Sequence, residues 1–96
     1  QAGRAENVVF VGRKPVMSYV VACLTLFNAG HREVLVKARG SAISTAVDSV
    51  ELLRRAFARD VEIGGVEIGT EEVTGFEGRK SNVSTMEISL VKAASG

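Results

Sequence analysis

The chain has 96 residues, of which 46% are hydrophobic and 24% are charged, a composition typical of a single soluble globular domain. No apolar run approaches the roughly 18 residues that a membrane-spanning helix needs, so no membrane partner is expected. The net charge is only +1, but five cations and one acid lie from Arg13 to Arg39, whereas six acids and no cation lie from Asp60 to Glu77. The near-neutral sum can therefore hide separate basic and acidic faces, and a basic face would attract a polyanion.

The first third of the chain predicts a strand followed by a helix. The β-branched run NVVFVG at 7–12 is typical of a central strand that is buried on both faces. A helix is expected at 14–30, with Pro15 in its first turn and Gly30 as a left-handed C-cap. This helix is apolar on nearly every side, so we expect a partner subunit to cover part of it.

The middle third repeats the strand-then-helix arrangement. Apolar and polar residues alternate at 33–39, which predicts a strand whose last outward positions are cationic. An amphipathic helix is expected at about 42–58, with Ser41 or Ser44 as its N-cap. Phe57 continues the helical spacing of apolar residues in this segment, so it is either a core residue or an exposed contact.

The last third predicts two strands joined as a hairpin. The segment 61–75 is rich in β-branched residues, and the pair Gly64-Gly65 interrupts its alternation, which indicates a turn or a bulge. A second strand with clean alternation is expected at 82–93. Between them, residues 75–81 form a cationic tip flanked by glycines.

The element order β-α-β-α-β-β predicts an α/β chain of the two-layer α+β type, in which a four-stranded mixed sheet carries two helices on one face. We expect residues 7–93 to form this single domain and residues 1–6 to be a disordered tail. The lone Cys23 and the lone His31 form no cluster with carboxylates, and the glycines match no nucleotide-binding motif. The sequence therefore predicts no enzyme, no metal site and no cofactor.

Two loops that lead from a strand into a helix carry cations. Arg13 and Lys14 precede the first helix, whose N-terminal N–H groups favour phosphate, although a solvated polar turn is the alternative. Lys37 and Arg39 end the second strand and lead into the second helix. Because the carboxyl ends of parallel strands lie together, we expect these four cations to share one edge of the sheet.

The hairpin tip is a third candidate site. Arg79 and Lys80 lie at the tip and Asn82 lies at its base, and a long basic hairpin can reach into a groove of nucleic acid. Phe76 at this tip either stacks on or wedges between bases, or it packs against its own hairpin.

The stretches GRKPVMSY, KARGSAIS and VSTMEI together closely resemble the Alba family of archaeal chromatin proteins, and the resemblance runs from Asn7 to about Lys92. It implies a homodimer of subunits with a fold similar to the C-terminal domain of bacterial translation initiation factor three. It also implies a cytoplasmic, chromosome-associated protein. Such a protein coats, compacts or bridges double-stranded DNA without sequence preference and also binds RNA. An RNA-binding subunit or RNA chaperone that acts on structured RNA is the alternative.

The same resemblance assigns roles to individual residues. Phe57 takes the role of a dimer–dimer contact along DNA. Arg13 stands where relatives often carry an acetylated lysine, which leaves Lys14 as the candidate modification site. Many relatives carry a second cation where this chain has Ser41. The residues implied to contact nucleic acid are Arg13, Lys14, Lys37, Arg39, Ser41, Arg79, Lys80 and Asn82.

Overall fold

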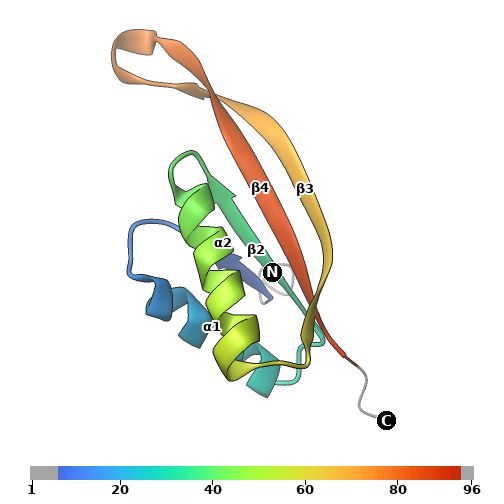
Figure 1. Ribbon diagram of the computed structural model, residues 1–96. Coiled ribbons are helices and arrows are strands. Elements are labelled where there is room, and N and C mark those ends of the chain that lie inside the picture. Colours follow the sequence, from blue (N-terminus) through green and yellow to red (C-terminus); the bar gives the residue numbers. More distant parts are fainter. Residues whose placement is uncertain (1–6, 94–96) are drawn as a thin grey trace.

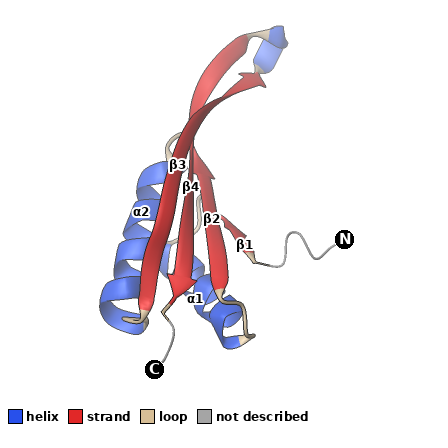
Figure 2. Ribbon diagram, turned by 90° about the vertical axis from the view of Figure 1, so that its right-hand side faces the viewer, coloured by secondary structure: helices blue, strands red, loops and turns tan. Residues whose placement is uncertain are grey.

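Four strands form one mixed sheet in the order β1-β2-β4-β3, and two helices cover one of its faces (Figures 1 and 2). The computed structural model describes residues 7–93, so the tail expected at 1–6 lies outside the described residues. The elements in chain order are β1 (Val8–Phe10), α1 (Val16–Asn28), β2 (Glu33–Arg39), α2 (Ala42–Leu52), β3 (Val61–Thr74) and β4 (Lys80–Lys92). The predicted order and fold class are therefore confirmed. No helix within the described part of the chain is long and apolar enough to cross a membrane.

The core lies between the sheet and the helices. β1 runs parallel to β2, and β4 runs antiparallel to both β2 and β3. Because side chains alternate along a strand, β2 directs Val34, Val36 and Ala38 toward the helices, and all three are buried as predicted. The helical segments contribute the buried side chains Tyr19, Val20, Cys23, Phe27, Ala46, Val50 and Leu53. The opposite face of the sheet has no helix over it, and we call it the open face.

The two ends of α1 differ in how well the sequence predicts them. Pro15 is the N-cap, with an extended backbone (φ −60°, ψ 154°), so it precedes the first turn instead of occupying it. At the other end Gly30 has a left-handed φ of 106°, as predicted. Its N–H bonds the carbonyl of Phe27, and the N–H of His31 bonds the carbonyl of Leu26, which together form a Schellman motif.

The glycine pair in β3 forms a bulge and not a turn. The strand continues through it, and its register against β4 shifts between Ile63 and Gly65. A Cβ atom on Gly64 would lie 2.8 Å from Cγ2 of Val91, which is closer than carbon atoms approach without displacement. The absence of a side chain at residue 64 therefore lets β3 bend here while it stays paired with β4.

Beyond β2, the β3–β4 hairpin continues alone as a projecting arm, which we define as residues 70–84 (Figure 1). The pairing of β2 with β4 ends at Arg39 opposite Thr85, and the part of β4 that precedes Thr85, residues 80–84, pairs only with β3. Five further residues at about 3.3 Å each carry the arm roughly 16 Å past the end of β2. A 3₁₀ turn at Phe76–Gly78 closes the tip of the arm.

Candidate nucleic-acid interface

The loops after β1 and β2 meet at one edge of the sheet, as expected for neighbouring parallel strands. A shallow hollow between these loops is lined by Arg13 from the first loop and by Arg39 and Ser41 from the second. We call this hollow the edge site. Lys14 lies exposed in the same loop as Arg13. The structure thus gathers cations from segments 26 residues apart, which is the geometry an anion site requires.

Tyr19 fixes the loop that carries Arg13 and Lys14. Its phenolic oxygen accepts hydrogen bonds from the backbone N–H groups of Gly12 and Lys14, both at 2.8 Å. The ring itself is buried in the core. Sequence reasoning gave Tyr19 no role, although one signal was available: a tyrosine early in an apolar helix needs a partner for its hydroxyl, and the adjacent loop can supply one.

The N-terminus of α2 lies at the edge site, which Ser41 and Ala42 line, and α1 begins two residues after Lys14. Pro15 caps α1 without a side-chain hydrogen bond, and Ser41 stands at the N-cap of α2 but makes no capping bond. The hydroxyl of Ser44 donates to the carbonyl of Ser41 at 3.5 Å, so it does not serve as the N-cap either. The first turn of each helix also lacks an acidic residue. Two first-turn N–H groups are already used, because that of Ser18 donates to the Pro15 carbonyl and that of Ile43 donates to the Gly40 carbonyl. The helix dipoles still favour an anion at these ends.

Two of the candidate cations are already paired with carboxylates of the hairpin strands. Arg39 Nη1 lies 2.8 Å from Glu71 Oε1, and Lys37 Nζ lies 3.5 Å from Glu87 Oε1. Lys37 does not line the edge site but a hollow on the open face, beside Phe10. Arg39 lines this hollow as well as the edge site, so the two loops meet at one edge while Lys37 lines only the hollow on the open face. Sequence reasoning did not anticipate either ion pair.

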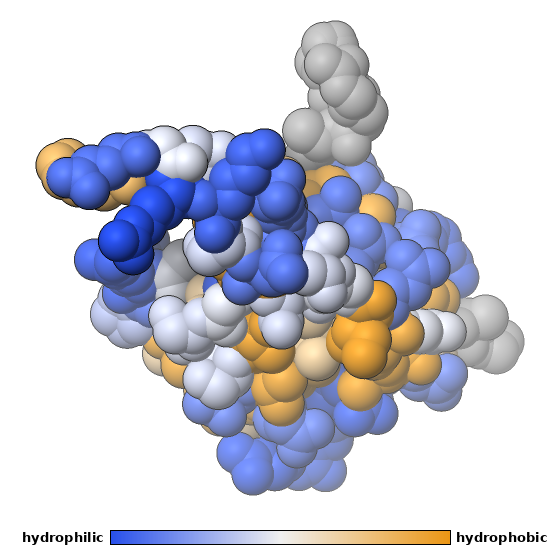
Figure 3. Space-filling model, turned by 90° about the horizontal axis from the view of Figure 1, so that it is seen from above, coloured by the Kyte–Doolittle hydropathy of each residue, from blue (hydrophilic) through white to orange (hydrophobic). Residues whose placement is uncertain are grey.

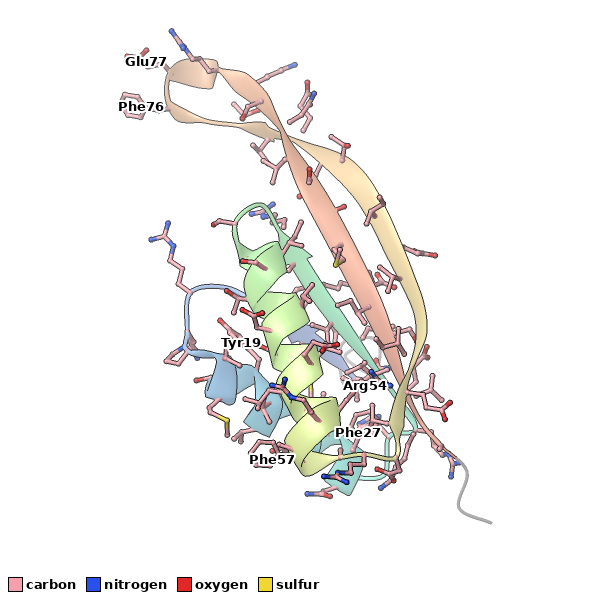
Figure 4. All side chains as sticks on the ribbon, in the orientation of Figure 1. Tyr19, Phe27, Arg54, Phe57, Phe76 and Glu77 are labelled. Carbon is pink, nitrogen blue, oxygen red and sulfur yellow. The ribbon has the colours of Figure 1, made fainter. Side chains whose placement is uncertain are left out.

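The arm holds the third group of candidate residues away from the edge site. Arg79, Lys80 and Asn82 are exposed near its tip, and neither cation makes an ion pair within residues 7–93. The ring of Phe76 is 88% exposed and points away from the hairpin (Figure 4), so it does not pack against its own strands. Seen from above, the arm is largely hydrophilic with an apolar patch at its end (Figure 3).

Phe57 leaves the core because the end of the second helix widens into a π-helical turn, Leu53–Phe57. The N–H of Ala58 bonds the carbonyl of Leu53 at 2.7 Å, five residues back. In a regular α-helix, residues 53 and 57 would lie on the same face. The wider turn redirects Phe57, which is 49% exposed although Leu53 is fully buried.

An uncovered apolar surface lies on β3. Ile63, Val66 and Ile68 lie opposite Leu90, Ile88 and Met86 of β4, so they point to the helix side of the sheet. They nevertheless remain exposed, Ile68 at 78%. We call these three residues the β3 strip. α1 exposes only Met17 and Val21 among its large apolar residues.

A metal centre and a reactive thiol are two kinds of site that enzymes commonly use. Within residues 7–93, no group of three His, Cys, Asp or Glu side chains is placed to hold a metal ion. Burial raises the pKa of the Cys23 thiol to about 11, so this thiol stays protonated at neutral pH and is a poor nucleophile.

Comparison with known proteins identifies a family and several relatives that resemble this chain. The Alba family model matches residues 7–70. The chain is 55% identical over 85 residues to the DNA/RNA-binding protein Alba of Methanocella arvoryzae, a match that covers 88% of each chain. It is 53% identical over 88 residues to the DNA/RNA-binding protein Alba 1 of Archaeoglobus fulgidus, covering 92% of this chain and 98% of that one.

Two solved structures share the fold. Alba from Thermoplasma volcanium superposes with a TM-score of 0.85 at 43% identity, covering 90% of this chain and 100% of that one. ALBA1 from Trypanosoma brucei superposes with a TM-score of 0.75 at 30% identity, covering 92% of this chain and 70% of that one. β4 lies beyond the segment that the family model matches, yet it pairs with both β2 and β3.

Proposed function

Because the chain belongs to the Alba family, we propose that it binds double-stranded DNA and RNA through their phosphates, without sequence preference. The observation that carries this proposal is the edge site, where Arg13 and Arg39 line one hollow beside the N-terminus of α2, whose first turn has no acidic residue. Phosphate contacts of this kind position a protein on nucleic acid and carry no sequence information. Both kinds of nucleic acid are proposed because the relatives are named for both.

In this proposal the edge site and the arm act on the same nucleic acid. Arg13, Lys14, Arg39 and Ser41 contact backbone phosphates, and Arg79, Lys80 and Asn82 follow a groove from the arm, which reaches roughly 16 Å past the end of β2. Lys37 joins only when its pairing with Glu87 is exchanged for a phosphate. The chain acts by binding and not by catalysis, and no cofactor takes part.

We further propose a homodimer in which the β3 strip of one protomer covers that of its partner. This assignment moves the expected partner contact from α1 to β3, because three β-branched residues remain uncovered there. Two arms would then embrace one duplex, and Phe57 would link neighbouring dimers that coat or bridge DNA. In this proposal residues 7–93 form the single domain. The protein is cytoplasmic and associates with the chromosome. Lys14 is its candidate modification site.

Salt dependence of binding tests the phosphate mechanism. With about six phosphate contacts per dimer, counterion release predicts that affinity for a duplex falls roughly a thousandfold between about 50 and 200 mM salt. Fluorescence anisotropy on two duplexes of unrelated sequence should give the same slope. A flat salt response, or a slope that depends on the sequence, would contradict the proposal.

A pair of double variants tests the location of the site. Replacing Arg13 and Lys14 by alanine should weaken binding to every sequence. The slope of log affinity against log salt concentration should fall by about one for each lost phosphate contact, which means about two per protomer. Replacing Arg32 and Arg59 removes the same charge from the opposite ends of the strands, where both residues are exposed. That control should change affinity much less. Equal losses in the two variants would indicate that net charge, not the edge site, drives binding.

Sedimentation tests the dimer and its interface. The wild type should sediment at twice the 10.2 kDa of one chain at micromolar concentration. Ile68→Glu should produce a folded monomer, whereas Val21→Glu on α1 should leave the dimer intact. A monomeric wild type would refute the dimer, and the reverse pattern of variants would move the interface to α1.

Affinities for duplex DNA, duplex RNA and single strands of equal length test the two proposed ligands. An A-form duplex has a wide, shallow minor groove, so an arm that suits one duplex need not suit the other. A clear preference for structured RNA would favour a role in RNA binding over one in coating DNA.

A further inference from the structure

Phe76 is the most exposed large apolar side chain among the described residues, and it stands at the far end of the arm (Figure 4). Its ring points away from both strands of the hairpin. An aromatic ring left in water is unfavourable, and ring burial is one of the larger contributions a single side chain can make to binding. Phe76 therefore contributes most to binding when a ligand covers its ring.

The tip is an ordered turn and not a loose loop. The N–H of Gly75 bonds the carbonyl of Arg79, and the N–H of Gly78 bonds the carbonyl of Gly75 at 3.2 Å. Glu77 takes a left-handed backbone conformation with φ 63°, which is uncommon for a residue with a side chain. These features fix the direction in which Phe76 leaves the backbone, so the ring is presented outward.

The neighbours of the ring indicate which ligand it meets. Arg79 and Lys80 follow three and four residues later, after Glu77 and Gly78, and neither cation is paired with a carboxylate within residues 7–93. Cations that hold phosphates bring the adjacent ring to the bases, whose faces are the broad apolar surfaces of a nucleic acid. We propose that Phe76 is a base-stacking residue, which directs the arm to sites where a base is unpaired. This inference rests on the proposed function, because phosphate contacts supply the remaining affinity.

Relative magnitudes decide between paired and unpaired bases. Stacking one base on an aromatic side chain strengthens binding by about five- to a hundredfold. Separating a stacked base pair to admit the ring costs a comparable amount or more. The ring therefore adds little affinity for a regular duplex. It adds its full stacking contribution where a bulged or single-stranded base is already unstacked. The selected ligand is a duplex that contains an unpaired nucleotide.

Binding to two matched duplexes tests this inference. One is fully paired, and the other has the same sequence with one bulged nucleotide. The wild type should prefer the bulged duplex about tenfold, and Phe76→Ala should lose that preference while its affinity for the paired duplex changes less than twofold. Phe76→Leu keeps an apolar side chain without a flat ring and should behave like the alanine variant. Equal losses on both duplexes, or a preference that leucine retains in full, would overturn the inference.

Phe76→Trp gives an independent spectroscopic readout, because the chain contains no tryptophan. Stacking should quench the emission of this single tryptophan on the bulged duplex and leave it nearly unchanged on the paired duplex. Unquenched emission on the bulged duplex would also overturn the inference. Failure of the proposed function looks different, since the wild type would then bind the paired duplex without salt dependence. All variants should unfold at the wild-type temperature, because Phe76 lies outside the core.

Discussion

The guanidinium of Arg39 lies 2.8 Å from the carboxylate of Glu71, so the cation at the end of β2 is bonded to the base of the arm. Both side chains are more than half exposed, at 62% and 51%. An ion pair in this setting contributes only about 0.2–1 kcal/mol. Glu71 therefore competes with phosphate for Arg39 but does not prevent a phosphate from replacing it.

Removing this competitor should strengthen nucleic-acid binding. Glu71→Gln should raise the affinity for duplex DNA by roughly two- to fivefold more than Glu72→Gln does. Glu72→Gln is the matched control, because it removes the same charge one residue later, where no ion pair exists within residues 7–93. Anisotropy titrations at about 50 mM salt measure both effects. Equal gains would indicate a general charge effect without a specific competition at Arg39.

The Tyr19 hydroxyl should be needed for the shape of the edge site. Tyr19→Phe removes the acceptor for two backbone N–H groups and should lower the free energy of unfolding by about 1–3 kcal/mol. Affinity for duplex DNA should fall a few-fold while the salt slope stays the same, because no charge is lost. Faster amide exchange at Gly12 and Lys14 would identify the loosened loop.

Thr25→Val is the control for the Tyr19 variant, since it removes a hydroxyl from the exposed side of α1, where Thr25 bonds the carbonyl of Val21. It should leave both binding and the two amides unchanged. Unchanged amide exchange in Tyr19→Phe would mean that the phenol does not hold the loop.

Local patterns were enough to predict the architecture. Alternation at Val34, Val36 and Ala38 identified the buried face of β2, and the parallel relation of β1 and β2 predicted that Arg13 and Arg39 would meet. These predictions succeed because side-chain period and strand direction are local or nearly local properties. The same reasoning predicts that α1 ends at Gly30, which has a left-handed φ of 106°.

The ion pair at Arg39 depends on long-range register, which a single sequence does not display. Arg39 and Glu71 are 32 residues apart, and a slip of one residue in the β3–β4 pairing would turn Glu71 to the other face. The π-helical turn that exposes Phe57 replaces a pattern with regular α-helical spacing. The apolar residues of α1 predict a partner surface there, and the structure shows that Tyr19 and Cys23 are buried in the core of the protomer while Met17 and Val21 remain exposed.

Cys23 should make the protein less stable at alkaline pH. Burial raises its pKa from 9.0 to about 11, so the fold favours the neutral thiol. The stability contributed by this preference is present below pH 9 and is lost as the pH rises from 9 to 11. Urea unfolding across this range measures the loss. Cys23→Ala should be less stable at neutral pH but should lack this alkaline component, and parallel pH curves for the two proteins would contradict the assignment.

Alanine should be tolerated at one glycine of the bulge and not at the other. A Cβ on Gly64 would lie 2.8 Å from Cγ2 of Val91, whereas a Cβ on Gly65 would have no heavy atom within 4 Å. Gly64→Ala should therefore lower the free energy of unfolding by about 1–3 kcal/mol. Gly65→Ala should be neutral or slightly stabilising, because alanine restricts the unfolded chain.

Urea denaturation with a shared m-value measures both glycine variants, and Val91→Ala should restore part of the stability of Gly64→Ala by making room for the added methyl. The bulge also sets the register that brings Glu71 to the side of Arg39. A shift of β3 along β4 in Gly64→Ala should consequently reproduce part of the gain in DNA affinity that is predicted for Glu71→Gln. Equal stability of the two glycine variants would mean that β3 does not bend at Gly64.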